Sequence, residues 1–155
     1  MTKPGHDHLA EAGETAPMVQ MAAMVIGAVF LLIGLAGFIP GITTGFDRLE
    51  WAGPHSGALL LDLFAVSVLH NTAHIAAGIA GLVLARAPGT ARVYLVCGGV
   101  LCSALWLYGV LIDHRGPLNV VPVNGAVNWL HLGLAAAMLG SGLALGRMTA
   151  RPDPV

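Results

Sequence analysis

The sequence predicts an all-α integral membrane protein, a bundle of four transmembrane helices, on two observations. Only 10% of the 155 residues are charged and 56% are hydrophobic, with a mean hydropathy of +0.78, whereas soluble domains carry roughly 25% charged residues. Four apolar segments account for this composition, and each reaches the length of about 20 residues that a spanning helix needs. The segments are Met18–Ile39, Gly57–Ala85, Ala91–Ile112 and Asn124–Leu145.

The chain divides into residues 1–17, a polar cytoplasmic tail, residues 18–146, a single four-helix transmembrane domain, and residues 147–155, a second cytoplasmic tail. The first tail is acidic and the apolar run that follows it is long. A secretory signal has a basic start and a short apolar region, so we expect the first segment to be retained as a helix. Gly37, Pro40 and Gly41 end it, because proline cannot continue the helical hydrogen bonds.

The other three helices follow in order. The second segment is longer than a bilayer requires, and with Arg86 at its cytoplasmic end it enters the hydrocarbon near Phe64. The third is expected to end at Ile112, before a polar loop that begins at Asp113. The fourth is expected to begin near Asn124 and to end before the next basic residue.

Lys and Arg residues predict the orientation. With four spans, the two tails and the loop between the second and third helices lie on one side of the membrane. Five of the 7 basic residues fall on that side, and the opposite side has only Arg48 and Arg115. The positive-inside rule therefore places both termini in the cytoplasm of a multi-pass cell-membrane protein.

Charge and motifs also exclude some functions. A net charge of −1 argues against nucleic acid as a partner, which requires a basic stripe. The sequence contains no nucleophile–base pair, phosphate loop or zincin motif, so we expect no enzymatic activity. Cys97 and Cys102 point in different directions on the third helix and are interpreted as small apolar fillers. The lipid bilayer is the expected partner.

Polar residues interrupt the second segment at "SVLHNTAHIAAG", Ser67 to Gly78. On a helix, His70, His74 and Asp62 share an arc with the small residues Ala73, Ala77 and Gly81, which favour close helix contact. That face is therefore expected to point into the bundle.

The fourth helix contributes a matching set. Anchoring it at Arg147 and the second helix at Arg86 puts His131 about as deep as His70, in the outer half of the bundle. Polar groups in hydrocarbon are costly unless they are paired or hydrated, so we expect them to meet. The predicted polar cluster consists of Asp62, His70, Asn71, His74, Asn124, Asn128 and His131.

Three roles for the cluster remain open. The first is structural or accessory: the cluster fixes helix packing through hydrogen bonds across the bundle, and this is our leading hypothesis. The second is a redox or transport protein in which His70, His74 and His131 bind a transition metal, or in which histidines of two helices ligate haem b. The third is a solute pathway with Asp62 at its mouth.

The fourth helix also carries a stripe of small residues opposite its polar side, which predicts packing against a second surface. The stripe consists of Gly133, Ala137, Gly140, Ser141 and Ala144. It leaves open a homo-oligomer or a larger membrane complex.

Two phrases of the sequence are specific: LHN-x-x-H within "DLFAVSVLHNTAHIAAGIAGL" and NWLH within "VPVNGAVNWLHLGL". With "GLAGFIPGIT", "ARVYLVCGGV" and "LWLYGVLIDH", they cover nearly the whole chain. Together these phrases resemble the DUF4383 family of small four-helix membrane proteins. The family has no assigned activity, so the resemblance implies the architecture and the importance of His70, Asn71, His74, Asn128 and His131. The family pattern has an asparagine where Ser67 stands and an acidic residue where Val127 stands, which implies fewer polar groups near the cluster in this member.

Overall fold

Four helices form the bundle in the computed structural model, which describes the backbone of residues 5–148 and the side chains of residues 17–145. Connected in chain order, the helices are α1 (Gly5–Ala36), α2 (Val68–Leu84), α3 (Pro88–Leu111) and α4 (Gly125–Met148). By length and composition, α1, α3 and α4 can each cross a membrane, and α2 is a shorter apolar helix of 17 residues. This confirms the predicted all-α membrane bundle.

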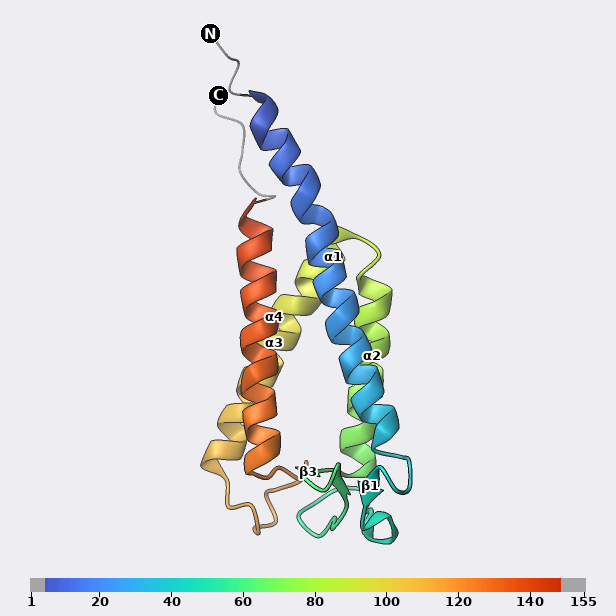
Figure 1. The fold of residues 1–155 in the computed structure, drawn as a ribbon. Coiled ribbons are helices and arrows are strands. Elements are labelled where there is room, and N and C mark those ends of the chain that lie inside the picture. The colour runs from blue at the N-terminus through green and yellow to red at the C-terminus, as the bar shows by residue number, and fades with distance from the viewer. Residues whose placement is uncertain (1–4, 149–155) are drawn as a thin grey trace.

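The helices associate as two antiparallel hairpins. Figure 1 shows α1 beside α2 and α3 beside α4, with α1 starting and α4 ending at the same end of the bundle. Within each hairpin the helices are in contact along their length, whereas α2 and α3 touch at few points. Glycines allow the close approach: a Cβ placed on Gly78 would lie 2.5 Å from the backbone nitrogen of Leu31.

A small antiparallel sheet covers the opposite end of the bundle (Figure 1). Its strands are β1 (Thr43–Thr44), β2 (Leu59–Leu60) and β3 (Phe64–Ala65), with β2 in the middle, and a short 3₁₀ turn (Phe46–Arg48) lies between β1 and β2. The β2–β3 connection has positive φ angles at Leu61 (53°) and Asp62 (59°), a conformation in which non-glycine residues are uncommon.

The start of the second helix differs from the prediction. The apolar segment from Gly57 was expected to be helical and to enter the hydrocarbon near Phe64, but α2 begins at Val68 and the preceding residues form the β2–β3 hairpin. Ser67 sets the boundary, because its hydroxyl accepts a hydrogen bond from the His70 backbone N–H at 3.1 Å and so caps the helix. At 1.5 Å per residue, 17 residues still extend about 25 Å.

The other helix ends lie within three residues of the predicted ones, except for the start of α1. α1 continues on its N-terminal side to Gly5, through most of the segment expected to be a tail, and ends at Ala36, three residues before Ile39. α3 starts at Pro88 rather than Ala91. Residues 149–155 lie outside the described part of the chain.

The exterior of the bundle is apolar where a soluble protein would be polar. Leu32, Leu101 and Trp129 are more than 60% exposed on three different helices. Inside, residues with almost no exposed surface join the two hairpins; they include Val19, Ala23, Leu95 and Met138. Outward apolar side chains around a small buried core are expected for helices that lie in lipid.

Candidate metal centre

Three imidazoles meet between α2 and α4. His70 and His74 lie one turn apart on α2, and His131 comes from α4. The ring centroids are 4.5 Å apart for His70 and His74 and 5.8 Å apart for His70 and His131. One nitrogen of each residue lies within 4.8 Å of the other two. The two helices thus bring their histidines to one level inside the bundle, and we call these three residues the His triad.

The triad is almost fully removed from the surface and is poorly hydrogen-bonded. His131 is 1% exposed, His70 5% and His74 7%. Among the residues that the structure describes, the Nδ1 atoms of His70 and His131 have no hydrogen-bond partner. A buried polar atom without a partner costs free energy, so the triad has unused binding capacity.

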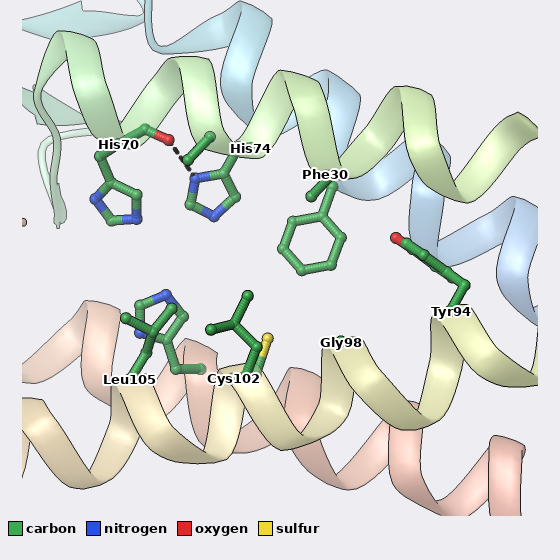
Figure 2. Close-up of a pocket in the computed structure, with 11 residues that line it drawn as sticks. Phe30, His70, His74, Tyr94, Gly98, Cys102 and Leu105 are labelled. Atoms are coloured by element: carbon green, nitrogen blue, oxygen red, sulfur yellow. Dashed lines mark hydrogen bonds between the residues drawn. The ribbon is translucent and has the colours of Figure 1, made fainter. Parts of the chain in front are cut away.

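A hydrogen bond determines which ring nitrogen of His74 carries the hydrogen. Its Nδ1 lies 2.9 Å from the backbone carbonyl oxygen of His70, and Figure 2 shows this contact along the face of α2. A carbonyl oxygen can only accept, so Nδ1 carries the hydrogen and donates it. The Nε2 lone pair of the neutral ring is then free for a ligand, an arrangement typical of metal-binding histidines.

The cluster's two other inner residues face different neighbours. Asn71 lies against Gly37, the residue that follows α1, and both atoms of its amide lack a partner within the described chain. Asn128 lies against α3 at Gly109; with its amide oriented to satisfy both neighbours, it donates to Trp106 O and accepts from Val110 N, each at 3.2 Å. Asn71 and Asn128 thus turn to the partner helices α1 and α3.

Asp62 and Asn124 lie at the end of the bundle that the small sheet covers. Asp62 accepts a hydrogen bond from the Thr44 hydroxyl at 3.0 Å on the exposed surface. Asn124 accepts from the Val127 N–H at 3.0 Å, capping α4, and donates to Leu63 O at 2.9 Å. The structure therefore brings together the three histidines and leaves Asp62 and Asn124 outside the triad. Asp62 lies apart because its segment is a hairpin and not a helix, and Asn124 lies apart because it caps the start of α4.

A cavity of about 100 Å³ borders the triad. In Figure 2 the His70 and His74 rings point from α2 into the space that separates this helix from α3. The walls are mostly apolar, and α1, α2, α3 and α4 all contribute to them. The lining residues are Phe30, His70, Ala73, His74, Ala77, Tyr94, Gly98, Leu101, Cys102, Leu105 and His131.

Six of these lining residues were not expected from the sequence to belong to the site: Phe30, Tyr94, Gly98, Leu101, Cys102 and Leu105. Phe30 of α1 lies 5.4 Å from His74 between ring centroids. Tyr94 and Cys102 of α3 are buried, while Cys97 is exposed, so the two cysteines do point in different directions. Tyr94 was the only one of these residues that the sequence could have indicated, as a polar side chain in an apolar helix. The others could not be assigned to the site, because the side of α3 that faces the cavity depends on how the helix packs.

The donor set suits a metal ion. Three neutral imidazoles are a common ligand set for Zn²⁺ and copper, and three protein ligands leave a fourth position open. A haem does not fit: pockets for cofactor-sized molecules measure roughly 300–1,000 Å³, and the cavity has about 100 Å³.

Fold and site together define a small multi-pass membrane protein with a buried histidine triad. The chain belongs to the DUF4383 family, a domain of unknown function, whose model matches residues 20–144. No curated protein and no solved structure matches the chain.

Position 67 is the N-cap of α2. Asparagine and serine are both strong helix N-caps, and Ser67 has this role here. Val127 is 1% exposed among Ala65 and Val123. Ser67 therefore fixes the start of α2, and Val127 makes an apolar contact between α4 and strand β3.

Proposed function

We propose that this protein is a metal-binding membrane protein in which His70, His74 and His131 hold a single Zn²⁺ or copper ion. The observation that carries the proposal is the convergence of three buried imidazoles, whose ligand atoms lie within 4.8 Å of one another. Hydrogen bonding within the bundle does not explain this convergence, because two of the rings have a nitrogen without a partner among the described residues.

The distances require little adjustment. With metal–nitrogen bonds of 2.0–2.1 Å, ligand atoms of a tetrahedral site lie about 3.3 Å apart. Nitrogens that start within 4.8 Å of one another reach this geometry when each moves by about 1 Å, which side-chain rotation provides. The His74–carbonyl hydrogen bond already orients one of the three rings.

The proposal includes a place in the cell membrane with both termini in the cytoplasm. The excess of basic residues on the side of the termini supports this orientation. The sheet-capped end of the bundle then faces outward, and the triad lies about one turn below it, since His70 follows the α2 cap at Ser67.

The hydrogen bonds across the bundle that a structural role requires are made, in the described part of the chain, by Asn128 and not by the triad. Asn128 joins α4 to α3 through two backbone groups, which is the cross-helix bonding that a packing function needs. The triad makes no such bonds to another helix among the described residues, so a purely structural role accounts for it less well.

The test is metal analysis of protein purified in mild detergent, followed by titration of chelator-treated protein with Zn²⁺ and with Cu⁺. We expect one ion per chain and a rise in melting temperature with metal. His74→Ala and His131→Ala should each weaken affinity at least about 100-fold, because even indirect supports of a metal site contribute 10–100-fold. His55→Ala, an exposed loop histidine, is the matched control and should bind as the unmodified protein does. Metal-free protein whose triad variants only melt earlier would reject the proposal.

A further inference from the structure

We propose that a groove between α1 and the end of α2 binds an anionic phospholipid, with the lipid phosphate at Arg86 and the first part of an acyl chain along α1. The groove has a volume of about 300 Å³. α1 lines it with residues that include Gln20, Met21 and Met24, and the facing side includes Leu82 and Arg86. None of the triad histidines lines it, so the proposal does not depend on a bound metal.

The groove crosses the boundary between water and hydrocarbon. The part of α1 that is apolar and long enough to span a membrane begins at Pro17, and α2 ends at Leu84, two residues before Arg86. The Gln20 side chain donates to the Ala85 carbonyl oxygen at 2.9 Å, which holds these two segments at one level. From Pro17, which also lines the groove, α1 runs about 10 Å deeper to Met24. One end of the groove therefore lies at the headgroup layer and the other among the acyl chains.

Arg86 supplies a positive charge at the headgroup end. Its side chain is exposed, and the acidic side chains that the structure describes are Asp47, Glu50, Asp62 and Asp113. All four belong to the connections at the opposite, sheet-covered end of the bundle, so none of them neutralises Arg86. A guanidinium group matches the geometry of phosphate with two parallel hydrogen bonds, and basic pockets between membrane helices bind anionic lipid headgroups.

The rest of the groove is apolar and faces lipid. Met21 is 60% exposed and Met24 52%, and Leu82 lies on the α2 side. Methionine side chains are flexible and adapt to irregular apolar surfaces. A phospholipid fits both parts of the groove, because its phosphate reaches the arginine while its chain covers the methionines. Inorganic phosphate would contact the arginine alone.

A second copy of the chain fits this groove less well. Its described acidic side chains lie at the other end of the bundle, so a copy packed with the same orientation in the membrane would not bring one of them to Arg86. A lipid of the same leaflet has its phosphate at this depth already. In the orientation proposed above, this is the cytoplasmic leaflet.

The experiment is native mass spectrometry of the delipidated full chain in detergent, mixed with equal amounts of dioleoyl phosphatidylglycerol and dioleoyl phosphatidylcholine. We expect one phosphatidylglycerol molecule to be retained, with an affinity about tenfold above that of phosphatidylcholine, which corresponds to one charge-assisted contact. Inorganic phosphate in excess should not displace it. Arg86→Gln should reduce the preference for phosphatidylglycerol to within twofold.

Matched variants separate the groove from general effects. Arg115→Gln removes an exposed arginine at the opposite end of the bundle and should leave the preference unchanged. Met24→Trp fills the acyl end of the groove and should weaken binding of phosphatidylglycerol. Leu32→Trp adds the same side chain at an exposed position of α1 outside the groove and should not weaken it. All four substitutions are at exposed positions, so the variants should fold, which circular dichroism in the same detergent checks.

Three outcomes would overturn the proposal. The first is equal retention of the two lipids by the unmodified protein, or equal loss of the preference in Arg86→Gln and Arg115→Gln. The second is displacement of phosphatidylglycerol by inorganic phosphate, which would make the groove a site for a soluble anion. The third is a lipid-free dimer that Met24→Trp abolishes and Leu32→Trp does not, which would identify a second copy as the occupant.

Discussion

The interfaces within the two hairpins and the seam between them are built differently. Within the hairpins, backbones nearly touch: a Cβ on Gly78 would contact the Leu31 backbone, and one on Gly27 would lie 3.0 Å from Gly81. At the α2–α3 seam the backbones stand apart, and histidine, phenylalanine and cysteine side chains surround a cavity.

This difference separates stability from function. Lipid provides no hydrophobic drive for helix association, so close van der Waals contact at small residues holds the hairpins together. The seam contributes less of this contact, and the Nδ1 atoms of His70 and His131 and the Tyr94 hydroxyl lie beside it without a partner among the described residues. Changes within a hairpin should therefore alter folding, whereas changes at the seam should alter binding.

The largest effect on stability is expected from Met138→Ala, inside the α3–α4 hairpin. Met138 is 0% exposed and packs on Gly98, so truncation leaves a cavity and should lower the free energy of unfolding by about 2–5 kcal/mol. Reversible denaturation in mixed micelles measures this. Leu143→Ala on the exposed side of α4 is the control, and equal losses in both variants would contradict the role given to the interface.

A smaller loss is expected from Gly78→Ala in the α1–α2 hairpin. The added Cβ would lie 2.5 Å from the Leu31 backbone nitrogen, so the helices must separate, at a cost of about 1–3 kcal/mol. Gly140→Ala adds the same atom where nothing lies within 4 Å and should change the melting temperature little. A Gly78→Ala protein as stable as the Gly140→Ala protein would show that the close approach is dispensable.

The smallest effect is expected from Asn71→Leu, on the side of α2 that faces α1. Asn71 is 1% exposed and its amide is unpaired among the described residues. Leucine has the same branching at Cγ and no polar atoms, which removes the cost of that burial, so stability should stay equal or rise by about 1 kcal/mol. Metal affinity should remain within twofold, because Asn71 does not belong to the triad. A large fall in metal affinity would show that Asn71 and the triad belong to one site.

Much of the site was predictable from spacing alone. His70 and His74 are four residues apart, so a helix places them on one face, and the Ala73–Ala77–Gly81 stripe indicates that this face meets protein. Counting from Arg86 and Arg147 put His131 at the same level, and a ring separation of 5.8 Å from His70 agrees with this.

The wrongly predicted start of the second helix has a local physical origin. The residues from Gly57 to Ser67 are apolar, and an apolar run does not distinguish a buried helix from short strands. The hairpin at Leu61 and Asp62 therefore remained unrecognised, and it carries Asp62 away from the triad.

The sequence by itself determined the membrane class, the helices and the inward histidines, because apolar length and helical period are local properties of the chain. Only the tertiary structure decided that Asn71 and Asn128 turn to other helices, that Asp62 lies at the sheet-covered end of the bundle, and that Phe30, Tyr94 and Cys102 line the cavity beside the triad. Those outcomes depend on the rotation and separation of packed helices, which contacts between distant residues determine.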